Sequence, residues 1–264
     1  MSSARPLRWR RTKTTAVLGA FIGLTVVGLV GLQRTAVPPP LVTPPPGPPA
    51  AGIDTSSFQH PHGARVDWRA VRESGISYAY VKATEGSDLV DPWFARDWAG
   101  VAKAGLYRGA YHYARPEAGS AVADADRFLR VMGPLDGPGD LPPALDVEEA
   151  GTLDPTALAD WVASWLAEVE QHTGRTPVIY TRASFWTAHL ADTDRFATSA
   201  LWVAHYTNDP DPGPPFGGWP TWTLWQWSST GTTFGVHAAV DQDRLAGGGP
   251  ALAALAAQRQ APTP

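Results

Sequence analysis

Short apolar runs alternate with helical stretches along the chain from Ala51 onward, and each apolar run carries polar residues at one end. Such alternation is typical of parallel strands that are joined by helices. The apolar runs predict eight strands: residues 52–54, 78–82, 107–113, 143–147, 177–181, 201–206, 222–227 and 237–241. Helices separate the first five or six of these strands and fade before the last ones. The pattern therefore predicts an α/β barrel of eight strands that begins with β/α units and ends almost entirely in strands.

Helical periodicity is clearest in residues 154–172. Asp154 is placed to cap the helix, Pro155 occupies its first turn, and one face is apolar. That face consists of Leu158, Trp161, Val162, Trp165, Leu166 and Val169. Further helices are expected over residues 67–74, 91–104, 121–132 and 184–190.

Polar and ionisable residues close several of the predicted strands. In a β/α barrel the functional groups gather at the carboxyl ends of the strands, so one mouth would collect them all. The residues are Asp54, Lys82 with Glu85, Tyr113, Asp146 with Glu148, Tyr180, Tyr206, Gln226 and Asp241.

The most informative of these groups is the carboxylate pair Asp146 and Glu148. Residues two apart on a strand point to the same face, with Cα atoms about 6.5–7 Å apart. Two such acids repel as anions, and this raises the pKa of one of them. Glycosidic bond cleavage needs one protonated and one ionised carboxyl group. A D-x-E triplet is weak evidence alone, because acidic pairs at strand ends are usually solvated or cap helices, but an apolar lead-in and the separate acids Asp54 and Asp241 strengthen it.

An ordered set of motifs is similar to those of the glycoside hydrolase family 25 lysozymes. The motifs are GIDTSSFQ at 52–59, YVKATEG at 80–86, GAYHYARP at 109–116, ALDVEE at 144–149, PVIYT at 177–181, LWVAHY at 201–206 and WTLWQWSSTG at 222–231. The resemblance implies an N-acetylmuramidase that cuts the β-1,4 bond between N-acetylmuramic acid and N-acetylglucosamine in peptidoglycan. It also implies a flattened, TIM-barrel-like fold of five β/α units and three further strands, (β/α)5(β)3.

By the same resemblance, Glu148 is the general acid and Asp146 is its partner, which orients the substrate's acetamido group or stabilises the oxocarbenium-like state. Asp54 and Asp241 match the two acids that flank this pair and tune its protonation. The substrate cleft is expected to be lined by Tyr113, Tyr180, Trp202, Tyr206, Gln226 and Glu85. One departure lies at the end of the domain, where Asp243 and Leu245 stand at positions more usually occupied by Asn and Phe. This departure predicts a local packing change and a shifted pH optimum.

The first fifty residues indicate membrane attachment. Residues 1–13 form a basic cytoplasmic segment, and the uncharged residues 14–32 can just cross a bilayer as a signal anchor. A cleaved signal peptide is the competing interpretation. Residues 33–50 form a linker, in which 38–50 hold eight prolines and form a semi-rigid spacer. The catalytic domain is expected over 51–249 and a C-terminal tail over 250–264. These features predict an extracytoplasmic protein that is tethered to the cell membrane, or is secreted if the segment is cleaved.

Charge and composition exclude several classes of function. The net charge is −4, but residues 1–50 hold six basic and no acidic residues, which leaves 15 basic against 25 acidic residues in the remainder. An acidic body without a basic stripe is a poor match to nucleic acid. Cysteine is absent, and the histidines show no HExxH or comparable zinc-ligand spacing, so neither metal nor cofactor is expected. We expect a monomer that binds peptidoglycan glycan strands. A tethered wall-binding module without turnover and a chitin hydrolase on the same scaffold are the alternatives.

Overall fold

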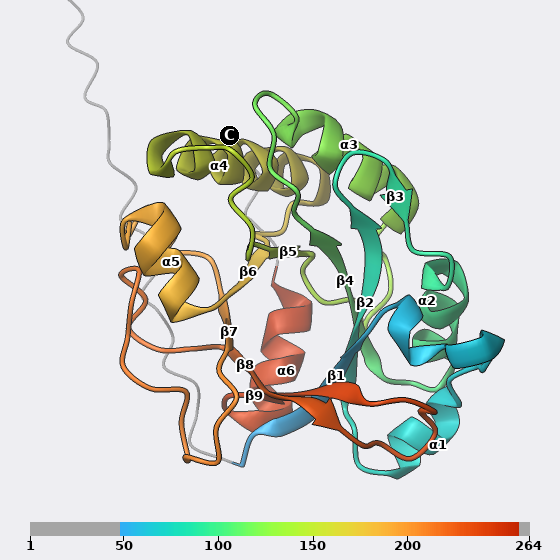
Figure 1. The fold of residues 1–264 in the computed structure, drawn as a ribbon. Helices are drawn as coiled ribbons and strands as arrows, with labels where there is room; N and C mark the ends of the chain where they lie inside the picture. The colour runs from blue at the N-terminus through green and yellow to red at the C-terminus, as the bar shows by residue number, and fades with distance from the viewer. Residues whose placement is uncertain (1–47, 259–264) are drawn as a thin grey trace, which may run out of the picture. The chain divides into compact units, whose positions relative to one another are not determined.

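In the computed structural model, which describes residues 48–258, eight strands close into a barrel (Figure 1). The strands are β1 (Ala50–Thr55), β2 (Tyr78–Glu85), β4 (Tyr107–Tyr113), β5 (Ala144–Asp146), β6 (Val178–Thr181), β7 (Leu201–Ala204), β8 (Leu224–Gly231) and β9 (Val240–Leu245). Neighbours pair in parallel from β1 through β8, whereas β9 runs antiparallel to both β8 and β1. The β1–β2 pairing closes the barrel. The predicted α/β barrel of eight strands is therefore confirmed.

Five helices follow the first five barrel strands in turn and cover the outside of the barrel. They are α1 (Trp68–Glu73), α2 (Phe94–Lys103), α3 (Ala121–Met132), α4 (Pro155–Thr173) and α5 (Ala183–Leu190). The predicted start of α4 is observed: the Asp154 side chain accepts from the Ala157 amide at 2.9 Å, and Pro155 is the first helical residue. Gly174 ends the helix with φ 62°. The β7, β8 and β9 strands follow one another without an intervening helix, which gives the (β/α)5(β)3 order.

Several features depart from the expected pattern. A two-residue strand, β3 (Leu89–Val90), pairs antiparallel with the end of β2. Two 3-10 turns, η1 (Ser57–Gln59) and η2 (Pro61–Gly63), follow β1. The last strand begins at Val240, later than the predicted 237. Residues 250–257, expected in a tail, belong to α6 (Gly248–Ala257), whose Leu252 is buried among the side chains inside the barrel.

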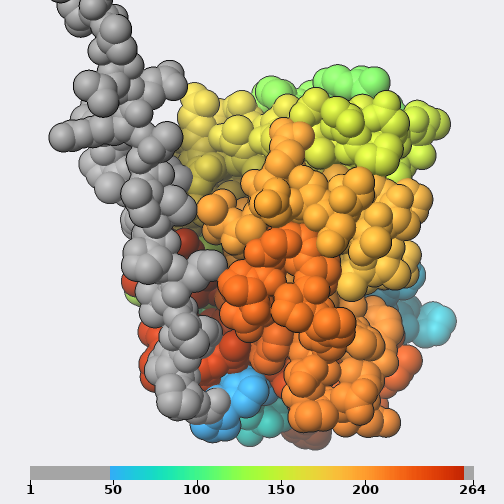
Figure 2. Space-filling model, turned by 90° about the vertical axis from the view of Figure 1, so that its left-hand side faces the viewer, coloured from blue at the N-terminus to red at the C-terminus, as the bar shows by residue number. Residues whose placement is uncertain are grey.

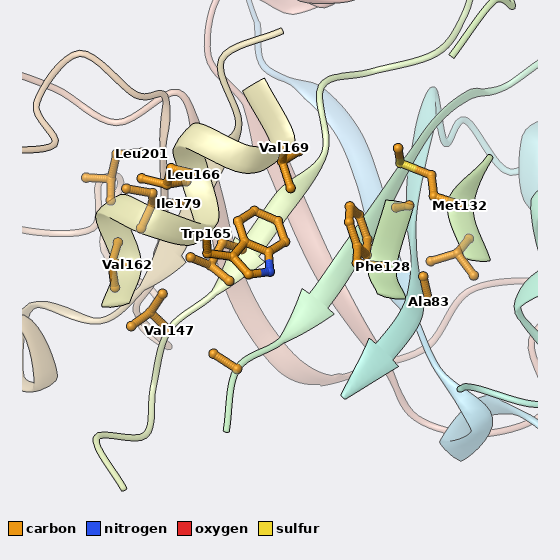
Figure 3. Close-up of a cluster of buried hydrophobic side chains, with 14 of the residues drawn as sticks. Ala83, Phe128, Met132, Val147, Val162, Trp165, Leu166, Val169, Ile179 and Leu201 are labelled. Atoms are coloured by element: carbon orange, nitrogen blue, oxygen red, sulfur yellow. The ribbon is translucent and has the colours of Figure 1, made fainter. Parts of the chain in front are cut away.

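Side chains of successive strand residues divide between two cores. The outer core lies between the strands and the helices, and Figure 3 shows part of it, with Trp165 and Val169 of α4 beside Phe128 and Met132 of α3. In β5 and the residue after it, Leu145 and Val147 belong to this outer core, whereas Ala144 lies in the inner core. This period of two aims every second strand residue into the barrel.

The inner core is narrow and filled by aromatic rings. Tyr80 lies 4.8 Å from Trp202 between ring centroids, and Tyr180 lies 5.1 Å from the same indole. Two glycines make room for these rings: a Cβ on Gly52 would lie 2.2 Å from the Tyr78 ring, and one on Gly109 would lie 2.1 Å from the Tyr80 ring. Each glycine is the register partner of the tyrosine that covers it. The glycines in GIDTS and GAYHY are therefore packing residues of the barrel interior.

The side of the barrel without a sixth helix is covered by other chain segments. Figure 2 shows α5 and the segment between β7 and β8 over this face. Trp219 of that segment packs on Trp186 of α5, with ring centroids 4.8 Å apart, and its indole donates to the Ser199 carbonyl at 2.9 Å. The long connection therefore seals the outer core where a helix is missing.

The predicted membrane segment, residues 14–32, lies outside the described residues. Among residues 48–258, no helix has both the length and the apolar character needed to cross a bilayer.

The glycine packing gives a stability test. Gly109→Ala should lower the free energy of unfolding by about 1–3 kcal/mol, because the added methyl group overlaps the enclosed Tyr80 ring. Gly139→Ala is the matched control, since its Cβ would meet nothing closer than 3.6 Å and its φ is not positive. Urea unfolding of both variants measures the difference, and equal stabilities would contradict this account of the interior.

Candidate active site

Polar side chains meet at the end of the barrel where the parallel strands terminate. Because β9 is antiparallel, its beginning lies at the same end, and Asp241 is the register partner of Asp54 on β1. On the other side, Tyr113, Asp146 and Tyr180 are successive register partners on β4, β5 and β6. The predicted acids are thus brought to one mouth, although Asp241 arrives from the start of its strand and not from its end.

Asp146 is the more deeply buried member of the central carboxylate pair, with 8% of its surface exposed. Burial raises its pKa well above the usual value, and the neighbouring charge of Glu148 raises it further, while Lys82 opposes the shift. Its Oδ1 atom has no hydrogen-bond partner among the described residues. This buried oxygen therefore has acceptor capacity that no described protein group uses.

Glu148 lies beyond the end of β5 but keeps the inward orientation. The intervening Val147 still pairs with β6: its amide donates to the Tyr180 carbonyl at 2.9 Å, and its carbonyl accepts from the Thr181 hydroxyl at 2.8 Å. Val147 belongs to the outer core, so its neighbours Asp146 and Glu148 share the opposite face. Partial burial raises the pKa of Glu148, and the charge of Arg182 opposes the shift.

Gln226 links three of the predicted residues. The Tyr180 and Tyr206 hydroxyls donate to its Oε1 at 2.9 and 2.7 Å, and its Nε2 donates to Asp54 Oδ2 at 2.7 Å. Burial and the charges of Asp241 and Asp243 raise the pKa of Asp54 well above the usual value. Burial also raises the pKa of Asp241, to about 6. All four predicted acids therefore hold protons more tightly than in water.

An ion-paired rim adjoins the carboxylate pair. Glu85 pairs with Lys82 and with Arg115, and hydrogen bonds from both lower its pKa, although burial acts the other way. Arg115 also pairs with Glu149, which accepts from the Tyr113 hydroxyl at 2.9 Å. The sequence placed Lys82, Glu85 and Tyr113 at this mouth but did not identify Arg115, Arg182 or Glu149 as part of the site.

Two predicted aromatic residues lie at different depths. Tyr206 is 55% exposed at the mouth, whereas Trp202 is only 2% exposed inside the barrel. Trp202 therefore supports Tyr180 from below and does not face the opening.

Beneath the acids lies Asp243, 1% exposed, whose Oδ1 accepts from the Trp202 indole at 2.8 Å. Asp243 points inward because it lies two residues after Asp241 on the same strand. This spacing, visible in the sequence, could have identified Asp243 as a residue of the interior.

Among the described residues, one group could approach a metal ion with three ligand atoms: Asp126, Glu168 and His172. It lies on α3 and α4, in the outer helical layer, and includes none of the acids of the mouth. The mouth itself is a set of carboxyl groups with raised pKa values, tyrosine hydroxyls and a glutamine amide. Such a set is suited to acid catalysis on a neutral, hydroxyl-rich ligand.

Comparison with known proteins shows the family to which this barrel belongs. The family model for glycosyl hydrolases family 25 matches residues 53–236. Lysozyme M1 of Streptomyces globisporus is 37% identical over 213 residues, 78% of this chain and 70% of that protein. The uncharacterized protein YegX of Escherichia coli K12 is 40% identical over 195 residues, 72% of this chain and 67% of that protein.

A solved structure shows the same likeness in three dimensions. The bacterial lysozyme from Streptomyces coelicolor superimposes with a TM-score of 0.73 at 37% identity, covering 78% of this chain and 96% of that one. The chain belongs to family 25 of the glycosyl hydrolases. The family match ends at residue 236, ahead of Asp241 and Asp243.

Gln226 offers a test of the site's hydrogen bonding. Gln226→Glu keeps the shape and the acceptor but places a carboxylate against Asp54, so stability should fall by about 1–3 kcal/mol at pH 8. The loss should be much smaller at pH 5, where a proton on the new acid restores the donor. Gln242→Glu is the control, because its amide donates to the Thr232 carbonyl in an exposed hydrogen bond. Equal losses at both pH values, measured by urea unfolding, would contradict the network.

Proposed function

We propose that this family 25 hydrolase is an N-acetylmuramidase that cleaves the β-1,4 bond between N-acetylmuramic acid and N-acetylglucosamine in peptidoglycan. The observation that supports it most is the pairing of Asp146 and Glu148 on one inward face, where burial raises the pKa of both. Two coupled carboxyl groups in a partly closed site hold a proton on one member at near-neutral pH. That is the state in which an acid can protonate a leaving glycosidic oxygen.

The two acids differ in depth, and this supports different roles. Glu148 is the less buried and faces Arg182 and Tyr113, so it is the member that a bound glycan reaches first. We assign it as the general acid. Asp146 lies deeper, and its unpartnered Oδ1 is available to accept from a substrate acetamido N–H or to stabilise positive charge on the sugar ring. Water then completes hydrolysis at the anomeric carbon.

The remaining residues of the mouth are assigned to substrate binding. Tyr206 presents an exposed ring whose hydroxyl is fixed by Gln226, which suits it to pack on a sugar. Tyr113 donates its hydroxyl proton to Glu149 of the rim and lies near the charge of Glu148. The lysozyme names of the relatives support peptidoglycan as the substrate in preference to chitin.

The direct test is mass spectrometry of soluble fragments released from purified peptidoglycan by the protein. We expect fragments with N-acetylmuramic acid at the reducing end. Glu148→Gln should lower the rate by about 10²–10⁴-fold, because the proton donor is removed. Glu149→Gln should lose far less, since that carboxylate pairs with Arg115 and Tyr113. Binding without release at any pH from about 4 to 8 would favour a wall-binding module, and release from chitin but not from peptidoglycan would favour a chitin hydrolase.

We also propose that residues 14–32 anchor the protein to the cell membrane and that the barrel lies outside the cytoplasm. The support is the uncharged apolar run that follows a basic segment, with a proline-rich spacer after it. In cells without a wall, added protease should digest the barrel of the full-length protein, and the protein should sediment with membranes. A variant lacking residues 1–50 should remain in the cytoplasm and be protected. Full-length protein found only in the medium would indicate a cleaved signal peptide instead.

A further inference from the structure

Asp243 lies directly beneath the mouth, on the strand that pairs with the strand of Asp54 and two residues after Asp241, the register partner of Asp54. It is 1% exposed, and its Oδ1 accepts from the Trp202 indole at 2.8 Å. Its Oδ2 is buried and receives no hydrogen bond from an N–H or hydroxyl donor among the described residues. The adjacent carboxyl group is that of Asp54, which lies on the neighbouring strand two residues after Gly52, the register partner of Asp243. Asp54 in turn accepts from Gln226 Nε2 at 2.7 Å on its Oδ2.

Two carboxyl groups in contact can form a hydrogen bond only if one of them carries a proton, because an ionised carboxylate is an acceptor alone. The surroundings favour keeping that proton. Acids, phenols, one indole and one amide face the pair. They are Asp241, Asp146, Tyr78, Tyr80, Tyr111, Tyr180, Tyr206, Trp202 and Gln226. Among residues 48–258, no lysine or arginine is among the groups that act most strongly on either carboxyl, whereas Lys82 faces Asp146. Two buried anions without a cation would be costly.

We propose that Asp243 is a positioning residue that shares one proton with Asp54, so that the geometry of Asp54 and the alkaline limit of activity depend on Asp243. While the proton is present, Asp54 is held on two sides, by the Gln226 amide that donates to it and by the proton that it shares with Asp243. When it is lost, the two carboxylates repel, and Asp54 moves relative to its register partner Asp241 at the substrate face. The catalytic half of this inference rests on the proposed hydrolysis, whereas the shared proton does not.

Asp243→Asn is the sharpest variant, because an asparagine keeps the acceptor for Trp202 and supplies a permanent N–H donor to Asp54. In the wild type, burial raises the pKa of Asp243 above 3.8 in the folded state, so stability falls as pH rises from that value. The variant lacks this loss. The Tm of the full-length variant, relative to wild type, should therefore rise by at least about 3 °C between pH 4 and pH 8.

Two further variants serve as a second test of the pair and as a control. Asp54→Asn supplies the donor from the other side of the pair and should flatten the dependence of Tm on pH in the same way. Asp136→Asn removes an exposed carboxylate and should leave the wild-type dependence unchanged. A Tm difference between Asp243→Asn and wild type that stays constant from pH 4 to pH 8 would overturn the shared proton.

Activity provides the second readout. The ratio of kcat/KM for Asp243→Asn to that for wild type should increase at least about threefold from pH 5 to pH 8, because the wild type alone loses the donor. A constant ratio with measurable activity would overturn the positioning role. If neither protein releases fragments while the Tm curves diverge as expected, the proposed hydrolysis fails and the shared proton stands.

Discussion

The pairing of β1 with strands on both sides is the constraint on which the rest of the structure depends. Its parallel partner β2 comes next in the barrel order, and its antiparallel partner β9 returns from the end of the chain. Only this closure brings Asp54 beside Asp241 and places both on the same mouth as Asp146. Within residues 48–258, the closed barrel also leaves no strand without neighbours on both sides, apart from the two residues of β3. Fold and site are therefore determined by the same hydrogen bonds.

The interior beneath the mouth determines how rigidly the acids are held. Tyrosine and tryptophan rings fill the barrel below them, and glycines on neighbouring strands admit the rings. The tyrosine hydroxyls and the indole N–H then supply polar atoms to the upper layer, as Tyr180 does for Gln226 and Trp202 does for Asp243. Large aromatic side chains with one polar end thus join a dry core to a polar site. A purely aliphatic interior would provide packing without these donors.

Sequence patterns predicted the barrel well because its strands and helices have strong local signals. The eight runs and the capped helix after Asp154 correspond to observed elements. The start of β9 was misplaced because the hairpin before it has weak periodicity, and β3 is too short to leave a pattern. At the site, strand ends identified the acids, but partners such as Arg115 and Glu149 depend on contacts between loops. Burial of Trp202 likewise depends on barrel packing, which a motif does not encode.

The concentration of acids at one mouth has a consequence for chemistry. Asp54, Asp146, Asp241 and Asp243 are all buried or partly buried, and burial raises the pKa of each. Folding therefore favours the protonated form of these four carboxyl groups. The cations Lys82, Arg115 and Arg182 lie on the other side of the mouth, near Glu148. The two sides of the mouth therefore differ. Protonated carboxyl groups are favoured around Asp54 and Asp243, and ionised carboxylates are favoured along the rim, where Glu85 and Glu149 pair with cations. A carboxyl such as Glu148, at the boundary of these regions, can hold a proton and can also release it, which is what an acid catalyst must do in each turnover.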